Sequence, residues 1–205
     1  MQIRTAALAL IAAAAAAPSF AAASDDAGTY LVRARAVYLQ SANKDSTGLD
    51  LSINDKVLPE VDLSYFFTQN VAAELILTYP QRQTVSSAGA AIGSLKHLPP
   101  VLSLQYHVTG LQGFRPYVGA GINFTHFSDV SFSPAVVTAL HPSVKSNSVG
   151  LSLQAGVDVP VGGGWLINAD VKQVQIQTDV YSSGVKAGTF KVDPLLLSVG
   201  VGKRF

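Results

Sequence analysis

Hydrophobic and polar residues alternate through eight separate stretches of the chain. In the first stretch, Tyr30, Val32 and Tyr38 share one face of an extended chain, and Arg33 and Arg35 share the other. The reason is that successive side chains of a strand point to opposite sides. The other stretches lie at 58–67, 71–79, 98–109, 115–127, 148–159, 165–176 and 195–204. The pattern predicts eight β-strands, each with one uniformly apolar face.

The seventh stretch departs from strict alternation. Its apolar positions change phase at Lys172 and Gln173, so that Val174 and Ile176 are expected to continue the apolar face. An extra residue in one strand, a β-bulge, produces such a change of phase. We therefore expect a bulge at Lys172–Gln173.

The connections between the stretches are of two lengths. Short connections lie at 68–70, 110–113 and 160–164, and long ones at 41–57, 80–97, 128–147 and 182–189. Short turns on one side and long loops on the other are typical of outer-membrane barrels, whose tilted strands need about 9–11 residues to cross lipid. The sequence predicts an all-β fold, an eight-stranded antiparallel transmembrane β-barrel with short periplasmic turns and long extracellular loops.

The alternative is a soluble β-sandwich or lipocalin-like barrel, in which the apolar face would point inward. The charges on the opposite face disfavour it. So do aromatic residues near the strand ends of the apolar face, which resemble two interfacial girdles. These aromatic residues are Tyr30, Phe67, Trp165 and Phe205 on the short-turn side, with Tyr38 and Tyr79 on the long-loop side.

The N-terminus has the features of a secretory signal peptide. Arg4 supplies a positive charge, residues 5–17 are apolar, and Ala21–Ala23 offer small residues for cleavage. We expect residues 1–23 to be removed and residues 24–205 to form a single outer-membrane domain. No apolar run after residue 24 is long enough for a transmembrane helix.

The composition excludes several functions. The 205 residues hold 14 Lys and Arg against 13 Asp and Glu, so the chain lacks the basic excess of a nucleic-acid binder. There is no cysteine, which excludes disulfides and thiol chemistry. The four histidines lack metal-ligand spacing. We expect no metal and no cofactor, and the expected contacts are outer-membrane lipid and small hydrophobic solutes.

If the apolar face meets lipid, the other face lines the lumen and carries balanced charges. An eight-stranded barrel is narrow enough to be filled by side chains, and buried charges must be paired. We expect a salt-bridged plug in the lower and middle lumen that prevents an open pore. Its predicted members are Arg33, Arg35, Glu60, Asp62, Glu74, Arg115, Asp158, Asp170, Lys172 and Arg204.

The loop-side half of the same face is apolar, which predicts a hydrophobic funnel. Its members are Val37, Leu39, Leu58, Ile76, Val101 and Leu196. Inner glycines at 119, 121, 150 and 156 leave room for a ligand or for large neighbours. Periodicity alone leaves open a second interpretation, in which these aliphatic residues only pack against one another under the loops.

Several segments resemble the OmpW/AlkL family of small outer-membrane proteins. They are Leu58–Thr68, Leu98–His107, Arg115–Thr125, Gly156–Asp158, Trp165–Lys172, Val192–Pro194 and Gly200–Phe205, and they cover nearly the whole mature chain in order. The resemblance implies an eight-stranded barrel with a hydrophobic channel that passes small hydrophobic molecules across the outer membrane of a Gram-negative bacterium. Lys203 departs from the apolar residue usual at its position, although a lysine near the interface can snorkel.

The favoured mechanism is passive transport without enzymatic activity. A solute enters the funnel, meets the plug and leaves sideways into the bilayer. Prolines near the loop-side strand ends mark weak points of the wall, because proline cannot donate to the ladder. These prolines are Pro59, Pro99, Pro100 and Pro194.

Two alternatives remain. One is a structural or surface-binding outer-membrane protein, a receptor or adhesion surface, with a filled lumen. The other is a lipid-modifying enzyme, which would use His126 and Ser128 as base and nucleophile together with a nearby carboxylate.

Overall fold

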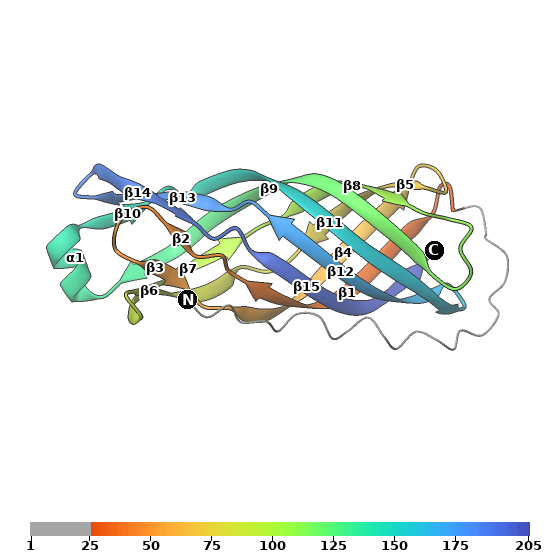
Figure 1. The fold of residues 1–205 in the computed structure, drawn as a ribbon, viewed down its shortest axis with the longest axis horizontal. Helices are drawn as coiled ribbons and strands as arrows, with labels where there is room; N and C mark the ends of the chain where they lie inside the picture. The colour runs from red at the N-terminus through yellow and green to blue at the C-terminus, as the bar shows by residue number, and fades with distance from the viewer. Residues whose placement is uncertain (1–25) are drawn as a thin grey trace, which may run out of the picture.

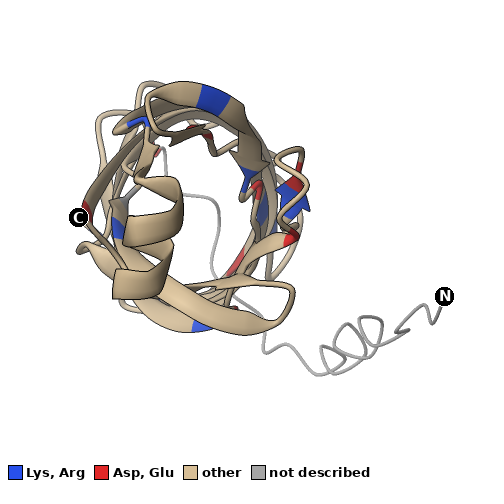
Figure 2. Cartoon of the chain, turned by 90° about the vertical axis from the view of Figure 1, so that its left-hand side faces the viewer, with Lys and Arg blue, Asp and Glu red and all other residues tan. Residues whose placement is uncertain are grey.

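The computed structural model describes residues 26–205; the predicted signal peptide, residues 1–23, lies outside them. Eight antiparallel strands pair in a closed ring, in the order β1–β4–β5–β8–β9–β11–β12–β15 and back to β1. Their bounds are Tyr30–Gln40 (β1), Lys56–Phe66 (β4), Val71–Leu77 (β5), Val101–His107 (β8), Arg115–Phe132 (β9), Asn147–Gly162 (β11), Trp165–Val174 (β12) and Leu195–Arg204 (β15). Figure 2 looks along this ring. The predicted eight-stranded barrel is confirmed.

The apolar faces of the strands point outward. In β1 the alternation is strict, since Tyr30 is 50% exposed and Leu31 is fully buried. The aromatic residues predicted to form girdles are exposed on the outer surface, including Trp165 and Phe205 at the short-turn end. Lys203, the residue that departs from the pattern, lies over the Trp165 ring at 5.4 Å. The exposed apolar band therefore follows from the period of two in the sequence.

The bulge expected at Lys172–Gln173 is absent, and the prediction is wrong. The β11–β12 register runs without a break from Pro160↔Leu166 to Ser152↔Val174, and its only irregularity lies between Pro160 and Gly162. Val174 and Ile176 are each 1% exposed and point inward. The reason is that the lumen itself turns from charged to apolar above Lys172, so an apolar inner face follows a charged one without any change of phase.

The segments predicted as long loops are folded into further strands. These are Lys44–Asp45 (β2), Leu51–Ile53 (β3), Gln81–Ser87 (β6), Ala90–Leu98 (β7), Pro142–Val144 (β10), Gln177–Ser182 (β13) and Val185–Lys191 (β14), with one short helix among the described residues, Pro134–Leu140 (α1). Strands β3, β6 and β7 continue the main sheet beside β9, and β10, β13, β14 and β2 form a second sheet. Together they make an extension beyond the barrel, opposite the C-terminus (Figure 1).

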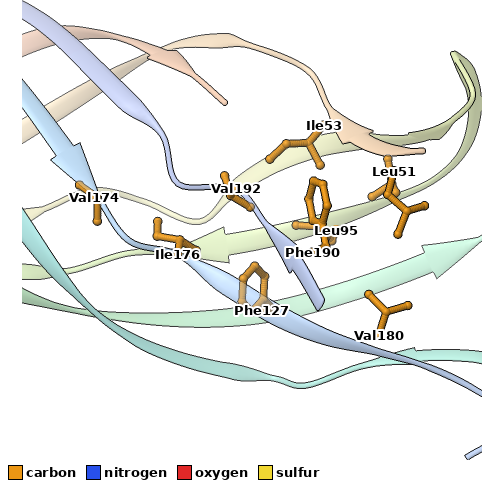
Figure 3. Close-up of a cluster of buried hydrophobic side chains, with 10 residues drawn as sticks. Leu51, Ile53, Leu95, Phe127, Val174, Ile176, Val180, Phe190 and Val192 are labelled. Carbon is orange, nitrogen blue, oxygen red and sulfur yellow. The ribbon is translucent and has the colours of Figure 1, made fainter. Parts of the chain in front are cut away.

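The extension lies beyond the apolar outer band and has its own hydrophobic core. Arg82 on β6 and Lys96 on β7 lie on the outer surface, with 53% and 33% of their side chains exposed, so both strands lie outside the lipid. Inside, buried aliphatic and aromatic side chains of β3, β6, β7, β13 and β14 pack with residues at the loop-side ends of β9 and β12 (Figure 3). They are Leu51, Ile53, Val85, Leu95, Phe127, Val174, Ile176, Val180, Phe190 and Val192. No helix within residues 26–205 is long and apolar enough to cross a membrane.

Candidate functional site: a charged lumen below an apolar cavity

Two arginines on neighbouring inward positions of β1 organise the middle of the lumen. The Arg33 guanidinium donates from Nε and Nη2 to both carboxylate oxygens of Asp158, at 3.2 and 2.7 Å. Its Nη1 lies 3.0 Å from Asp62 Oδ1. Arg33 is fully buried, and the two-pronged geometry is the one in which a guanidinium binds a carboxylate most strongly. Arg33 thus joins β1 to β11 on one side and to β4 on the other.

Arg35 continues this network toward the loop side. Its Nε lies 3.0 Å from Glu60 Oε1, and its Nη2 lies 2.8 Å from Asp62 Oδ2 and 3.1 Å from Glu74 Oε1. Gln154 Nε2 donates to the other oxygen of Glu74 at 2.8 Å. Asp62 of β4 and Glu74 of β5 therefore each pair with both arginines.

Lys172 and Asp170 of β12 complete the network. Lys172 Nζ lies 3.8 Å from Glu60 and 4.0 Å from Asp170, and Tyr117 Oη donates to Asp170 at 2.9 Å. The Tyr117 ring occupies the space that a side chain at Gly156 would need. Likewise Gln154 and Gln105 fill the space beside Gly119, and Ser103 that beside Gly121. Gly119 and Gly156 therefore accommodate large side chains, whereas the closest atom to a side chain at Gly121 or Gly150 would be a backbone oxygen.

The ten residues predicted for the plug fall into two groups. Eight of them form the single network just described, with three cations and five carboxylates. The other two, Arg115 and Arg204, both pair with Asp26 at the short-turn end. Arg204 also lies over the Phe66 ring, 4.3 Å from its centroid. Sequence reasoning missed Asp26 because it precedes the first alternating stretch.

An apolar cavity of about 30 Å³ lies directly on the loop side of the ionic network. Glu60 and Lys172 form its floor. The remaining lining residues are Val37, Leu39, Leu58, Thr78, Gln81, His97, Pro99, Val101, Val174, Ile176, Pro194 and Leu196. Five of the six predicted funnel residues therefore meet around one cavity. The sixth, Ile76, is buried but lies lower, beside Asp62 and Val101 in the ladders.

The sequence did not predict that four of the residues lining the cavity point inward, for two different reasons. Val174 and Ile176 were assigned to the outer face through the incorrect bulge. Gln81 and His97 fell in a segment predicted as a loop, where no inward or outward face could be assigned. Continuing the alternation of the preceding strand, which buries positions 72, 74 and 76, would have placed Gln81 outside, because the phase changes before β6 begins.

The barrel wall beside the cavity contains a gap. The β4–β5 ladder ends at Val61↔Leu77, whereas β4 continues to Lys56 paired only with β1. Across the gap, Thr78 Oγ1 donates to the Pro59 carbonyl at 3.3 Å, and Lys56 Nζ donates to the Arg82 carbonyl. Among residues 26–205, no backbone ladder closes this part of the wall.

The side chains considered for enzymatic chemistry have other partners. The His126 ring, which is exposed, contacts Asn147 Oδ1 through Nδ1 at 2.8 Å. Asp129 forms an ion pair with Lys96 at 2.7 Å. Within the described part of the chain, residues 26–205, no carboxylate forms a hydrogen bond with His126 or Ser128.

Residues 26–205 match the model of the OmpW family over their whole length. The chain belongs to the OmpW family. It is 42% identical over 164 residues to the uncharacterized outer-membrane protein y4mB of Sinorhizobium fredii, which covers 77% of this chain and 70% of the relative. It is 33% identical over 213 residues to outer membrane protein W of Vibrio cholerae, which covers 97% of each chain.

A solved structure of this kind has the same fold. The crystal structure of the outer membrane protein OprG from Pseudomonas aeruginosa superimposes with a TM-score of 0.75 at 25% identity, covering 87% of this chain and 96% of that chain. As an OmpW-family protein, the chain is an outer-membrane barrel of a Gram-negative bacterium. Its short turns accordingly face the periplasm, and the extension faces the outside.

Proposed function

We propose that this OmpW-family protein passes small hydrophobic molecules passively from the outside into the outer membrane, through the apolar cavity above the charged network. The observation that carries the proposal is the position of the cavity, whose aliphatic walls stand directly on paired charges. A membrane barrel gains nothing from an aliphatic lining unless apolar groups pack there. A solute that moves from water into the cavity gains roughly 25 cal/mol for each Å² of apolar surface buried.

The way in runs through the extension. Val174 and Ile176 line the cavity and also belong to the hydrophobic core of the extension. The apolar surface is therefore continuous from the cavity toward the outside. Because the cavity holds only about 30 Å³, well below the several hundred Å³ of ordinary ligand pockets, these side chains must separate to admit a solute.

The way onward to the periplasm is blocked. A hydrocarbon moving down from the cavity would have to separate Arg33 and Arg35 from their carboxylates. Parting buried charges in this way leaves them unpaired, which costs several kcal/mol. The solute therefore leaves through the wall.

The gap between β4 and β5 is the proposed exit. It borders the cavity, since Leu58 and Thr78 on its two sides both line it. On the outer surface it is flanked by exposed apolar residues, Val57 at 65%, Val61 at 48% and Tyr79 at 54% exposure. A molecule passing the gap therefore meets acyl chains at once, without crossing a hydrogen-bonded ladder.

Uptake of a labelled terpene into proteoliposomes with a lipopolysaccharide-containing outer leaflet tests the route. The variants Leu39→Asp and Leu58→Asp place a charge in the cavity wall, and we expect at least a tenfold fall in uptake. Gln40→Asp, on the exposed neighbour of Leu39, is the matched control and should transport normally. Normal uptake by both cavity variants would contradict the proposal.

A pair of engineered cysteines tests the exit. Pro59 and Tyr79 are the next outward-facing positions beyond Val61↔Leu77, and a disulfide between Pro59→Cys and Tyr79→Cys would tie the gap shut. We expect uptake to stop on oxidation and return on reduction. The pair Leu63→Cys and Leu75→Cys lies within the existing ladder and should have no effect. Equal uptake in the oxidised and reduced forms of the first pair would exclude this exit.

A structural or surface-binding role is the second candidate. It is favoured by the small size of the cavity and by the closed core of the extension, because a filled lumen is what that role predicts. The same uptake assay decides between the two, since a purely structural barrel would not accelerate terpene uptake over protein-free liposomes.

A further inference from the structure

One side of the cavity wall is polar. Gln81 of β6 and His97 of β7 are ladder partners and both line the cavity. They are almost fully buried, with 1% and 0% exposure. Gln81 uses its amide nitrogen to donate to the Tyr79 carbonyl at 3.0 Å. Within residues 26–205, Gln81 Oε1 and both ring nitrogens of His97 have no hydrogen-bond partner.

These unpaired atoms define a hydrogen-bonding site of a particular kind. Burial, with a smaller contribution from the positive charge of Lys56, lowers the pKa of His97 to about 4. The imidazole is therefore neutral at pH 7 and offers one N–H donor and one nitrogen acceptor. With Gln81 Oε1, the site presents two acceptors and one donor at the edge of an aliphatic cavity. Buried polar groups are rarely left unpaired, because the loss of their hydration is not compensated.

We propose that the solutes of this cavity are neutral amphiphiles, with an apolar chain that ends in a hydroxyl group bound between Gln81 and His97. The inference rests on the proposed transport function and narrows its substrate class. A hydroxyl donates one hydrogen bond and accepts another, so it pairs with Gln81 Oε1 and with the imidazole N–H at the same time. The aliphatic chain then packs against Leu58, Val101 and Leu196.

Two neighbouring classes of solute fit less well. A plain hydrocarbon fills the aliphatic part but leaves the polar atoms of Gln81 and His97 unpaired. A fatty-acid carboxylate carries no proton to donate to Gln81 Oε1. It would also enter above a network in which five carboxylates face three cations, with Glu60 in the cavity floor.

Binding of 1-octanol, n-octane and octanoate to the protein in lipid nanodiscs tests the inference. Methyl resonances of Leu58 and Val101 report occupation of the cavity, and the side-chain ¹⁵N resonances of His97 report hydrogen bonding. We expect octane and octanol to shift the methyl resonances and octanol alone to shift those of His97. In Gln81→Leu and His97→Phe, the affinity for octanol relative to octane should fall about tenfold, as expected for a lost hydrogen bond.

Gln83→Leu provides the matched control. Gln83 lies two residues further along the same face, is equally buried and also has an unpaired Oε1, but it does not line the cavity. The relative affinity for octanol should be unchanged in this variant. Retained octane binding shows that each variant keeps its cavity.

Three results would overturn the inference. If octanol leaves the His97 resonances unmoved, or if the octanol-to-octane ratio is the same in all variants, the polar atoms are satisfied by water and select nothing. If octanoate binds as tightly as octanol, the class is wrong. If no solute shifts the methyl resonances, the transport proposal fails as well. Failure of the transport proposal is thereby distinguished from failure of the substrate class alone.

Discussion

Arg33 Nη2 lies 2.7 Å from Asp158 Oδ2, although 125 positions separate the two residues in the chain. Both side chains are fully buried. The pair bridges β1 and β11 across the lumen, between strands that are not neighbours in the barrel. Such a contact can form only after the ring of strands has closed. The ionic network in the lumen therefore depends on closure of the barrel.

Removing Arg33 should therefore destabilise the whole barrel. Arg33→Met removes the arginine that pairs with Asp158 and one of the two that pair with Asp62, and loss of one partner from a buried ionic network costs roughly 3–5 kcal/mol. Urea unfolding in lipid vesicles, followed by the fluorescence of Trp165, the single tryptophan, measures the loss. Arg82→Met, in an exposed pair with Asp129 at 3.9 Å, is the control and should unfold like the wild type. A loss below about 1 kcal/mol in Arg33→Met would show that the network contributes little.

The Tyr117 ring leaves no space for a side chain at position 156, which is glycine. A methyl group at this position would overlap the end of that ring and push its hydroxyl away from Asp170, so Gly156→Ala should cost about 1–3 kcal/mol, as overpacking does in cores. Combining it with Tyr117→Leu should recover part of the overpacking cost, giving a non-additive double-mutant cycle. Ala155→Val, on the adjacent outward position, should be tolerated. Additive losses in the double variant would show that the two residues do not compete for space.

The inward orientation of Ile176 can be tested with charge. Ile176→Lys buries an unpaired ammonium in the apolar cluster, so the extension should lose roughly 3 kcal/mol of stability, become sensitive to external protease and lose terpene uptake. Gln177→Lys points outward and should be silent in both assays. If Gln177→Lys were damaging and Ile176→Lys were tolerated, Ile176 would point outward, as a bulge at Lys172–Gln173 predicts.

The turn after β2 should be sensitive to acid. Burial alone would raise the pKa of Asp45, but the hydrogen bonds that its carboxylate accepts from the Leu51 and Thr47 amides and the Thr47 hydroxyl outweigh this effect and hold the pKa below 3.8. A depressed carboxyl pKa contributes stability above the unfolded value, and that contribution is lost as the pH falls through the folded value. The order of residues 45–51 should therefore persist above the ordinary aspartate pKa and weaken as the pH falls through the lower folded value.

The amide resonance of Leu51 measures this transition directly. Its chemical shift should titrate with a midpoint below 3.8, and in Asp45→Asn the titration should disappear. A midpoint above 3.8 in the wild type would mean that the hydrogen bonds do not outweigh burial.

The sequence alone determined which side of each barrel strand faces lipid. Side chains alternate strictly along a strand, so Tyr30, Val32 and Tyr38 had to point one way and Arg33 and Arg35 the other. With the two lengths of connection, this local rule was enough to predict the number of strands, the barrel and its membrane. It failed at Val174 and Ile176, because a pattern of polarity cannot distinguish a bulge from a lumen whose own polarity changes with depth.

Only the tertiary structure decided which inward residues meet. The partners of Arg33 come from β4, β5 and β11, and the residues that line the cavity come from strands at both ends of the chain. The distances between them therefore depend on the register and closure of the barrel. The gap beside Pro59 and the polar edge at Gln81 and His97 depend on where one ladder stops and another begins. Those end points are set by the packing of the extension, which no local period in the sequence records.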